Sequence, residues 1–186
     1  MTLFLDTETT GLSPSSGADL VEVAIVNDDG DVILNTLVDP GSQIPPEVAA
    51  IHGITDSMVS GAPPVAEVRQ QVLKLVRGVE LVIYNAPFDT AFFPGIEQTA
   101  AATRCCMRRF SDEWPCRVWS AEQDGWKRQK LSTAAAHVGH DWQGAGAHRA
   151  LADALACRTV WRWLEVQNEG VGKREEFDFL PRKSIM

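Results

Sequence analysis

Apolar runs in the first forty residues predict three β-strands. Residues 3–5, 20–26 and 32–38 are mostly apolar, and the second and third runs are rich in β-branched side chains. Such side chains favour strands because they fit a pleated, half-buried surface. The polar, glycine-containing segment 27–31 is typical of a hairpin turn. The chain therefore begins with strands that pair through hairpins.

Helices and a further strand follow along the chain. Proline suits the first turn of a helix, so Pro45 predicts a short helix and Pro63 a longer one that ends at Gly78. Residues 79–84 predict a strand. Helical patterns then occupy three later segments, residues 86–98, 131–138 and 147–166. Hairpin-linked strands followed by alternating helix and strand are typical of an α/β domain with a mixed sheet.

Composition agrees with one globular domain. The chain has 186 residues, of which 45% are hydrophobic and 23% charged. No run approaches the ~18–20 apolar residues of a membrane helix, and no basic stretch precedes the first apolar run. The four cysteines form no Cys-x-x-Cys pair. We therefore expect a cytoplasmic protein with free thiols and no membrane contact.

Charge is unevenly distributed along the chain. Residues 1–68 hold eleven acidic residues and neither Lys nor Arg, so their net charge is −11, whereas the remainder carries +3. The electrostatic field of a net-negative protein attracts nucleic acid poorly. A polyanion could still bind locally, if metal cations occupied an acidic site and a wall of basic residues faced it. Residues 104–130, with seven bases and three tryptophans, could supply that wall. On charge alone, a solvated surface is the favoured interpretation.

Asp6 and Glu8 form the first candidate for chemistry. They lie two residues apart at the end of a predicted strand, so both side chains point to one face. Neighbouring buried carboxylates raise each other's pKa unless a cation holds them, and ligands collect at the carboxyl ends of strands. The alternative is two solvated acids. Asp89, after the next strand, is the second candidate, although acids near a helix N-terminus are also a common structural feature.

His148 and Asp153 form the third candidate. Five residues on one helix would separate their side chains by ~140°, so the two converge only if His148 precedes the helix. Gly144 and Gly146 would allow a loop that carries His148, while Asp153 occupies the first turns. The alternative is a surface histidine beside an ordinary helical acid.

Together, these segments resemble the DnaQ-like 3′–5′ exonucleases. Residues 4–12, 85–89 and 148–154 are similar to the three exonuclease motifs in order, and residues 51–55 match a further family signature. The histidine in the third motif places the resemblance in the DEDDh class. Tyr84, the only tyrosine, stands where many relatives have His. We expect this difference at position 84 to leave metal binding unchanged and to affect how the nucleotide is contacted.

The resemblance implies a ribonuclease-H-like fold, an α/β domain with a mixed five-stranded sheet flanked by helices. It implies that Asp6, Glu8, Asp89 and Asp153 bind two divalent cations, Mg²⁺ or Mn²⁺, and that His148 accepts the proton of the attacking water. The residues that it places at the terminal nucleotide are Thr9, Thr10, Gly11, Leu12, His52 and Asn85. For His52, a structural role at a helix end is an equal alternative.

The implied activity is release of nucleoside 5′-monophosphates from the 3′ ends of DNA, with single strands favoured. The alternatives are an exoribonuclease acting on short or structured RNA, a haloacid-dehalogenase-type phosphatase, and a non-catalytic interaction module. The phosphatase pattern requires Asp where Glu8 stands. We expect the exonuclease domain over residues 1–166 and a tail over 167–186.

Two large apolar residues, Phe177 and Phe179, interrupt this polar tail. Either they cover a groove of their own domain, or the tail docks a polymerase, a sliding clamp or a second copy of the chain.

Overall fold

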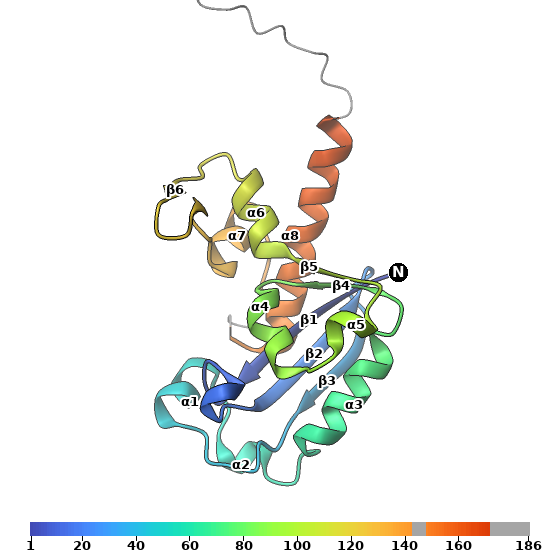
Figure 1. Ribbon diagram of the computed structural model, residues 1–186, viewed down its shortest axis with the longest axis vertical. Coiled ribbons are helices and arrows are strands. Elements are labelled where there is room, and N and C mark those ends of the chain that lie inside the picture. Colours follow the sequence, from blue (N-terminus) through green and yellow to red (C-terminus); the bar gives the residue numbers. More distant parts are fainter. Residues whose placement is uncertain (143–147, 172–186) are drawn as a thin grey trace, which may run out of the picture.

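The computed structural model describes residues 1–142 and 148–171 and has a mixed five-stranded sheet as its centre (Figure 1). The sheet has the strand order β3-β2-β1-β4-β5. The first three strands are antiparallel, whereas β4 and β5 run parallel to β1. The strands are β1 (Thr2–Thr9), β2 (Leu20–Asn27), β3 (Val32–Leu37), β4 (Glu80–Ile83) and β5 (Ala102–Cys105). The predicted ribonuclease-H-like α/β fold is thus confirmed.

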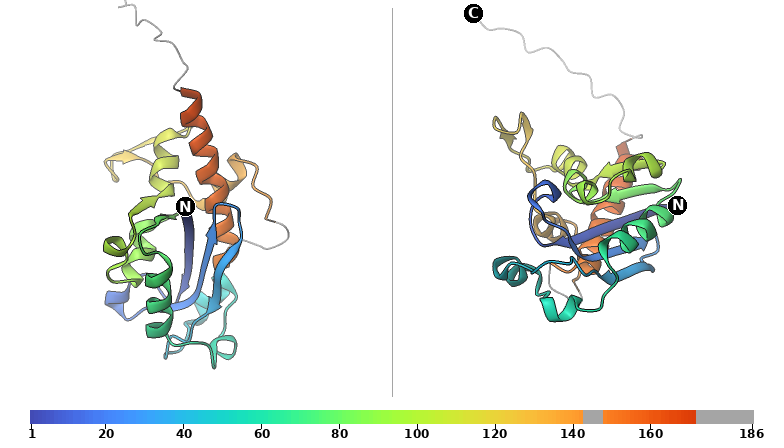
Figure 2. Two further views of the ribbon diagram at one scale, coloured as in Figure 1. Left: turned by 90° about the vertical axis from the view of Figure 1, so that its right-hand side faces the viewer. Right: turned by 60° about the horizontal axis from the view of Figure 1, so that its bottom comes forward.

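Helices cover both faces of the sheet (Figure 2). Helix α3 (Val65–Leu75) packs on one face, and its apolar side chains join those of β1, β2 and β4. On the other face lie α6 (Cys106–Glu113), α7 (Leu131–His137) and the long α8 (Ala150–Val171). Helix α8 crosses β1 and β2. Within the described residues, none of the helices has the length and apolar character needed to cross a bilayer.

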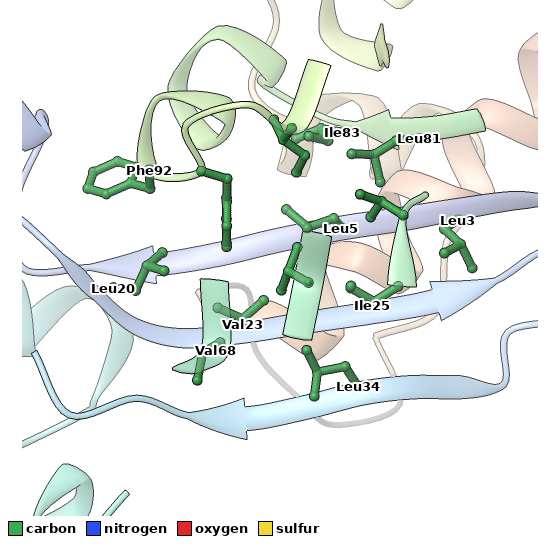
Figure 3. Close-up of a cluster of buried hydrophobic side chains, with 14 of the residues drawn as sticks. Leu3, Leu5, Leu20, Val23, Ile25, Leu34, Val68, Leu81, Ile83 and Phe92 are labelled. Carbon is green, nitrogen blue, oxygen red and sulfur yellow. The ribbon is translucent and has the colours of Figure 1, made fainter. Parts of the chain in front are cut away.

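Alternation along β1 divides its side chains between the two faces. Leu3 and Leu5 belong to the buried cluster under α3, which Figure 3 shows. Phe4 belongs to the cluster on the α8 side. Because strand side chains alternate, Asp6 and Glu8 continue the Phe4 face toward α8, whereas Thr7 faces the opposite side.

Proline and glycine divide the helix predicted over residues 86–98. The structure has α4 (Ala86–Asp89), a 3₁₀ turn (Thr90–Phe92) and α5 (Ile96–Thr99) in its place. Pro94 cannot donate a helical hydrogen bond, and Gly95 adopts φ 87°. The short pieces α1 (Pro46–His52) and α2 (Asp56–Val59) connect β3 to α3.

Several elements between residues 102 and 126 were not predicted. They are β5, α6 and a two-stranded hairpin of β6 (Trp119–Ser120) and β7 (Gly125–Trp126). Their charged sequences lack the apolar alternation that marks a half-buried strand. Helix α8 continues past residue 166 to Val171. The predicted loop glycines Gly144 and Gly146 and the tail residues Phe177 and Phe179 lie outside the described residues.

Candidate active site

Three of the predicted acidic residues meet where β1 ends and α8 begins. Asp6 and Glu8 project from β1, and Asp153 lies in the first turn of α8. One carboxylate oxygen from each residue lies within 4.8 Å of the other two. The packing of α8 across β1 and β2 produces this arrangement, because it brings the first turn of the helix over the polar end of the strand.

Asp89 approaches the cluster from the opposite side of the sheet. It ends α4, is 3% exposed and accepts a 2.7 Å hydrogen bond from the Thr7 hydroxyl. Thr7 lies between Asp6 and Glu8 in sequence and points to the other face. Because side chains alternate along β1, this one strand supplies the carboxylates of Asp6 and Glu8 on one face. On the other face it supplies Thr7, which holds the carboxylate of Asp89.

Burial and mutual repulsion raise the pKa of all four carboxyl groups. Burial raises the pKa of Glu8 to about 8, of Asp89 to about 7 and of Asp153 to about 6. The pKa of Asp6 is raised well above its usual value, first by burial and then by the charge of Asp89. Such a group of acids is fully ionised at neutral pH only when cations compensate the charge. Its oxygen donors fit the hard ions Mg²⁺ and Mn²⁺.

Glu22 is a functional residue that the sequence reasoning missed. It pairs with Glu8 across β1 and β2, is 3% exposed, and binds the start of α8. Its carboxylate accepts hydrogen bonds from Arg149 Nη2 at 2.6 Å and from the Ala150 amide at 2.9 Å. An acid inside the otherwise apolar run 20–26 was the available signal, because buried charges require partners. Glu22 thereby fixes the helix that carries Asp153.

His148 precedes α8, as the helical geometry required. Its side chain is exposed, and its backbone has φ 73°, a left-handed conformation that is uncommon outside glycine. The His148 amide donates to both carboxylate oxygens of Asp153 at 3.3 and 3.4 Å. The segment is therefore held in a strained conformation beside the acidic cluster.

The segment after β1 forms a tight turn with one exposed residue. Thr9 donates to the Gly11 carbonyl at 2.7 Å, and the Thr10 hydroxyl accepts from the Asp19 amide at 2.9 Å. A Cβ atom on Gly11 would lie 3.3 Å from the Ala18 Cβ, so the glycine allows close packing within the turn. Leu12 is 88% exposed. Of the four residues predicted to meet a nucleotide here, Leu12 is the one whose side chain reaches solvent.

His52 and Asn85 occupy different environments. His52 ends α1, is 4% exposed, and its Nδ1 accepts from the Ile54 amide at 3.0 Å. Burial lowers the pKa of His52, and this environment fits its structural interpretation. Asn85 begins α4 and lines a cleft with His148 and Asp153. The predicted nucleotide contacts of both residues stay predictions.

This cleft has a volume of about 460 Å³, and the basic residues Arg128 and Lys130 form part of its wall. Residues 128–132, which precede and start α7, form that wall together with Met107. Tyr84 anchors it, because its hydroxyl donates to the Gln129 carbonyl at 2.9 Å. Burial raises the pKa of Tyr84, so the hydroxyl stays a donor. The departure from the family pattern at position 84 thus positions Arg128 and Lys130 beside the acidic cluster.

The acidic residues gather where the central strand β1 ends, an arrangement that suits a metal-dependent nuclease, and the comparisons with known proteins agree with this class. The family described as RNase_T, exonuclease, matches residues 3–160. "Uncharacterized exonuclease CP81" of Escherichia phage 186 is 39% identical over 180 residues, covering 90% of this chain and 88% of the relative. DNA polymerase III subunit epsilon of Pasteurella multocida is 28% identical over 175 residues, covering 86% of this chain and 66% of the relative.

A solved structure extends the agreement to the fold. Exonuclease X in complex with 5′ overhanging duplex DNA is similar with a TM-score of 0.67 and 26% identity, covering 92% of this chain and 93% of the other. The chain belongs to the RNase_T exonuclease family. The predicted enzyme class, a DnaQ-like exonuclease, is thereby confirmed. These matches favour the exonuclease over the two alternatives, the phosphatase and the non-catalytic module.

Proposed function

We propose that this chain is a metal-dependent 3′–5′ exonuclease that releases nucleoside 5′-monophosphates from DNA. The observation that carries the proposal is the meeting of Asp6, Glu8 and Asp153 within 4.8 Å, with Asp89 beside them. An acidic cluster of this kind repels a phosphodiester unless cations intervene. Cations bound here would therefore reduce the repulsion among the carboxylates and also the repulsion between the carboxylates and the phosphodiester.

Asp6, Glu8, Asp89 and Asp153 would hold two divalent cations. When bound, such ions lower the pKa of water and neutralise charge that develops on the phosphate and the leaving oxygen. The protein's own contribution is to keep four carboxylates together where the central strand β1 ends, with Thr7 orienting Asp89 and Glu22 orienting the start of α8.

His148 would accept the proton of the attacking water. An imidazole is suited to this task because its ordinary pKa lies near neutrality. The exposed ring is tethered next to the cluster through the amide of its own residue, which contacts Asp153. Leu12 and Asn85 would contact the terminal nucleotide, and the exposure of Leu12 beside the end of β1 and the position of Asn85 in the wall of the cleft support this role.

DNA is the favoured substrate, since Exonuclease X was solved with DNA and another relative is named as a DNA polymerase subunit. We favour single-stranded 3′ ends, with short RNA as the competing substrate. All four cysteines are free, which fits the reducing cytoplasm that we propose as the location.

A time course on matched, 5′-labelled DNA and RNA oligonucleotides tests this proposal. With Mg²⁺ or Mn²⁺, a ladder of labelled products that shorten stepwise is expected, and chelator should stop it. Immediate release of a labelled mononucleotide would indicate the opposite polarity, and internal cleavage would indicate an endonuclease. Faster degradation of RNA than of DNA would contradict the substrate assignment. Asp6→Asn serves as the inactive control.

We also propose that the tail, residues 167–186, contacts a polymerase, a sliding clamp or a second copy of this chain. Deletion of residues 172–186 tests this. An unchanged melting temperature and unchanged activity on short oligonucleotides would support a role in partner binding. A clear fall in melting temperature of the monomer would instead support a tail that covers its own domain.

A further inference from the structure

The β6–β7 hairpin presents an aromatic and basic surface that catalysis does not use. Trp119 is 58% exposed, and its ring packs edge to face on Trp126 with centroids 5.5 Å apart. The guanidinium of Arg117 lies 4.6 Å from the centre of the Trp126 ring. Figure 1 shows the hairpin projecting beside α6 and α7. We refer to residues 117–127 as the Trp hairpin.

Packing of the domain does not account for this surface. Trp114, Trp161 and Trp163 belong to the buried cluster on the α8 side or pack against it. Trp119 and Trp126 belong to none of the buried clusters of the described residues. Trp119 and its apolar neighbour Val118, which is 61% exposed, therefore form a surface that is available for stacking.

A continuous chain of contacts connects the Trp hairpin to the acidic cluster. The Lys127 amide donates to the Val118 carbonyl at 2.8 Å, and the Arg128 amide donates to the Gln123 side chain at 2.9 Å. Gln129 is held by Tyr84, and Lys130 lines the cleft that contains His148 and Asp153. At ~3.3 Å per residue, Trp126 lies at most ~13 Å from Lys130.

The charges along this path suit a polyanion. Arg117, Lys127 and Lys130 are exposed, and the structure gives Arg128 a single long ion pair, 3.7 Å, with the exposed Asp112. The acidic residues Glu122 and Asp124 lie in the connecting turn rather than on the path. This basic path contrasts with the acidic first 68 residues, so a strand that leaves the cleft is attracted in this direction.

We propose that the Trp hairpin binds the single-stranded DNA upstream of the 3′ end that occupies the acidic cluster. Trp119 stacks on a base, and Arg117, Lys127, Arg128 and Lys130 contact phosphates. Aromatic stacking next to a basic groove is how proteins hold single strands without reading sequence. Because the hairpin lies at most ~13 Å from Lys130 in the cleft, it meets the DNA upstream of the terminal nucleotide. This inference rests on the proposed function and defines its substrate as single-stranded DNA.

Substrate length separates hairpin binding from catalysis. The full chain and its Trp119→Ala variant are compared on oligothymidylates of about 15 and about three nucleotides, and binding of the longer one is also measured by fluorescence anisotropy. We expect Trp119→Ala to raise KM and Kd for the longer strand about 5- to 150-fold, with the KM ratio falling toward one as the strand shortens. Trp119→Phe, which keeps an aromatic ring, should restore most of the binding.

A charge variant tests the same surface without touching the tryptophan pair. Lys127→Ala should reduce the slope of log Kd against log salt by about 0.7, the value for one lost phosphate contact on a single strand. Lys74→Ala, at an exposed position on α3 across the sheet, should leave the slope unchanged.

Distinct results would overturn each idea. Equal Kd for wild type and Trp119→Ala on the longer strand, or an equal rise in KM at both lengths, would overturn the hairpin assignment. A wild-type chain that degrades no oligonucleotide would overturn the proposed function, while the Kd comparison would still decide the role of the hairpin.

Discussion

The acidic cluster and the Trp hairpin achieve their arrangements by opposite means. The cluster is half-buried, with Asp89 its one fully buried member, its carboxylates come from β1, α4 and α8, and the fold brings like charges together. The hairpin projects from the domain, is built from neighbours in sequence, and places the Arg117 guanidinium over the Trp126 ring. Without cations, the carboxylates of the cluster repel one another, whereas the contact between Arg117 and Trp126 in the hairpin is attractive. Under the two proposals, cations would compensate the charge of the cluster, and the hairpin would compensate the charge of the substrate phosphates.

Removing one carboxylate has the largest expected effect. Asp6→Asn or Asp153→Asn should abolish hydrolysis, because the cations lose a charged ligand. The melting temperature of the metal-free protein should rise or stay the same, because repulsion among the remaining acids is relieved. Turnover and thermal denaturation in chelator provide the two measurements. Near-wild-type turnover in either variant would contradict the metal assignment.

Loss of the proton acceptor should cost less. His148→Ala is expected to lower kcat by ~10²–10⁴-fold, the usual contribution of a general base, while Mn²⁺ and DNA still bind. Single-turnover rates and Mn²⁺ titration separate these effects. If the variant loses its affinity for Mn²⁺, His148 is a ligand rather than a base.

The pH dependence of stability offers a test of the buried charges. The folded pKa values, about 8 for Glu8, 7 for Asp89 and 6 for Asp153, exceed the ordinary values for unfolded carboxyl groups. The folded chain therefore binds more protons than the unfolded chain, and metal-free stability should fall as the pH rises from about 4 through about 8. Mg²⁺ should offset the loss at the upper end.

Urea denaturation across this range, with and without chelator, measures that slope. Glu8→Gln is the matched variant, because it removes a carboxyl group whose pKa is raised to about 8 and should flatten the metal-free curve. A wild-type protein that becomes more stable with rising pH in chelator would refute the picture of a repulsive cluster.

The smallest expected effect concerns how α8 is held. Glu22→Gln should lower the free energy of unfolding by about 1–3 kcal/mol, because charge-assisted hydrogen bonds to Arg149 and Ala150 become neutral ones. Activity should also fall, since the position of Asp153 depends on the same helix start. Urea denaturation supplies the stability value. Glu67→Gln, at an exposed position on α3, is the control and should change neither quantity.

Local patterns in the sequence determined a large part of this protein. The alternation of β1 predicted that Asp6 and Glu8 share a face, and helical geometry predicted that His148 and Asp153 converge only if His148 precedes the helix; α8 begins at Ala150, three residues after the predicted start. Both inferences depend only on residues close together in the chain, for which the spacing of side chains is fixed by the backbone. The family resemblance then supplied the five-stranded sheet that the pattern of strands alone left incomplete.

Tertiary structure decided what depends on distant residues. Thr7 fixes Asp89 from the opposite face of β1, Glu22 meets Arg149 at a separation of 127 residues, and Tyr84 anchors Gln129. The hairpin has strands of two residues each, too short for apolar alternation to predict, and a cross-strand tryptophan pair joins them. No periodicity encodes such contacts, since they depend on how helices pack across the sheet. The sequence alone thus predicted the candidate site residues, and packing decided what holds them and where the basic path begins.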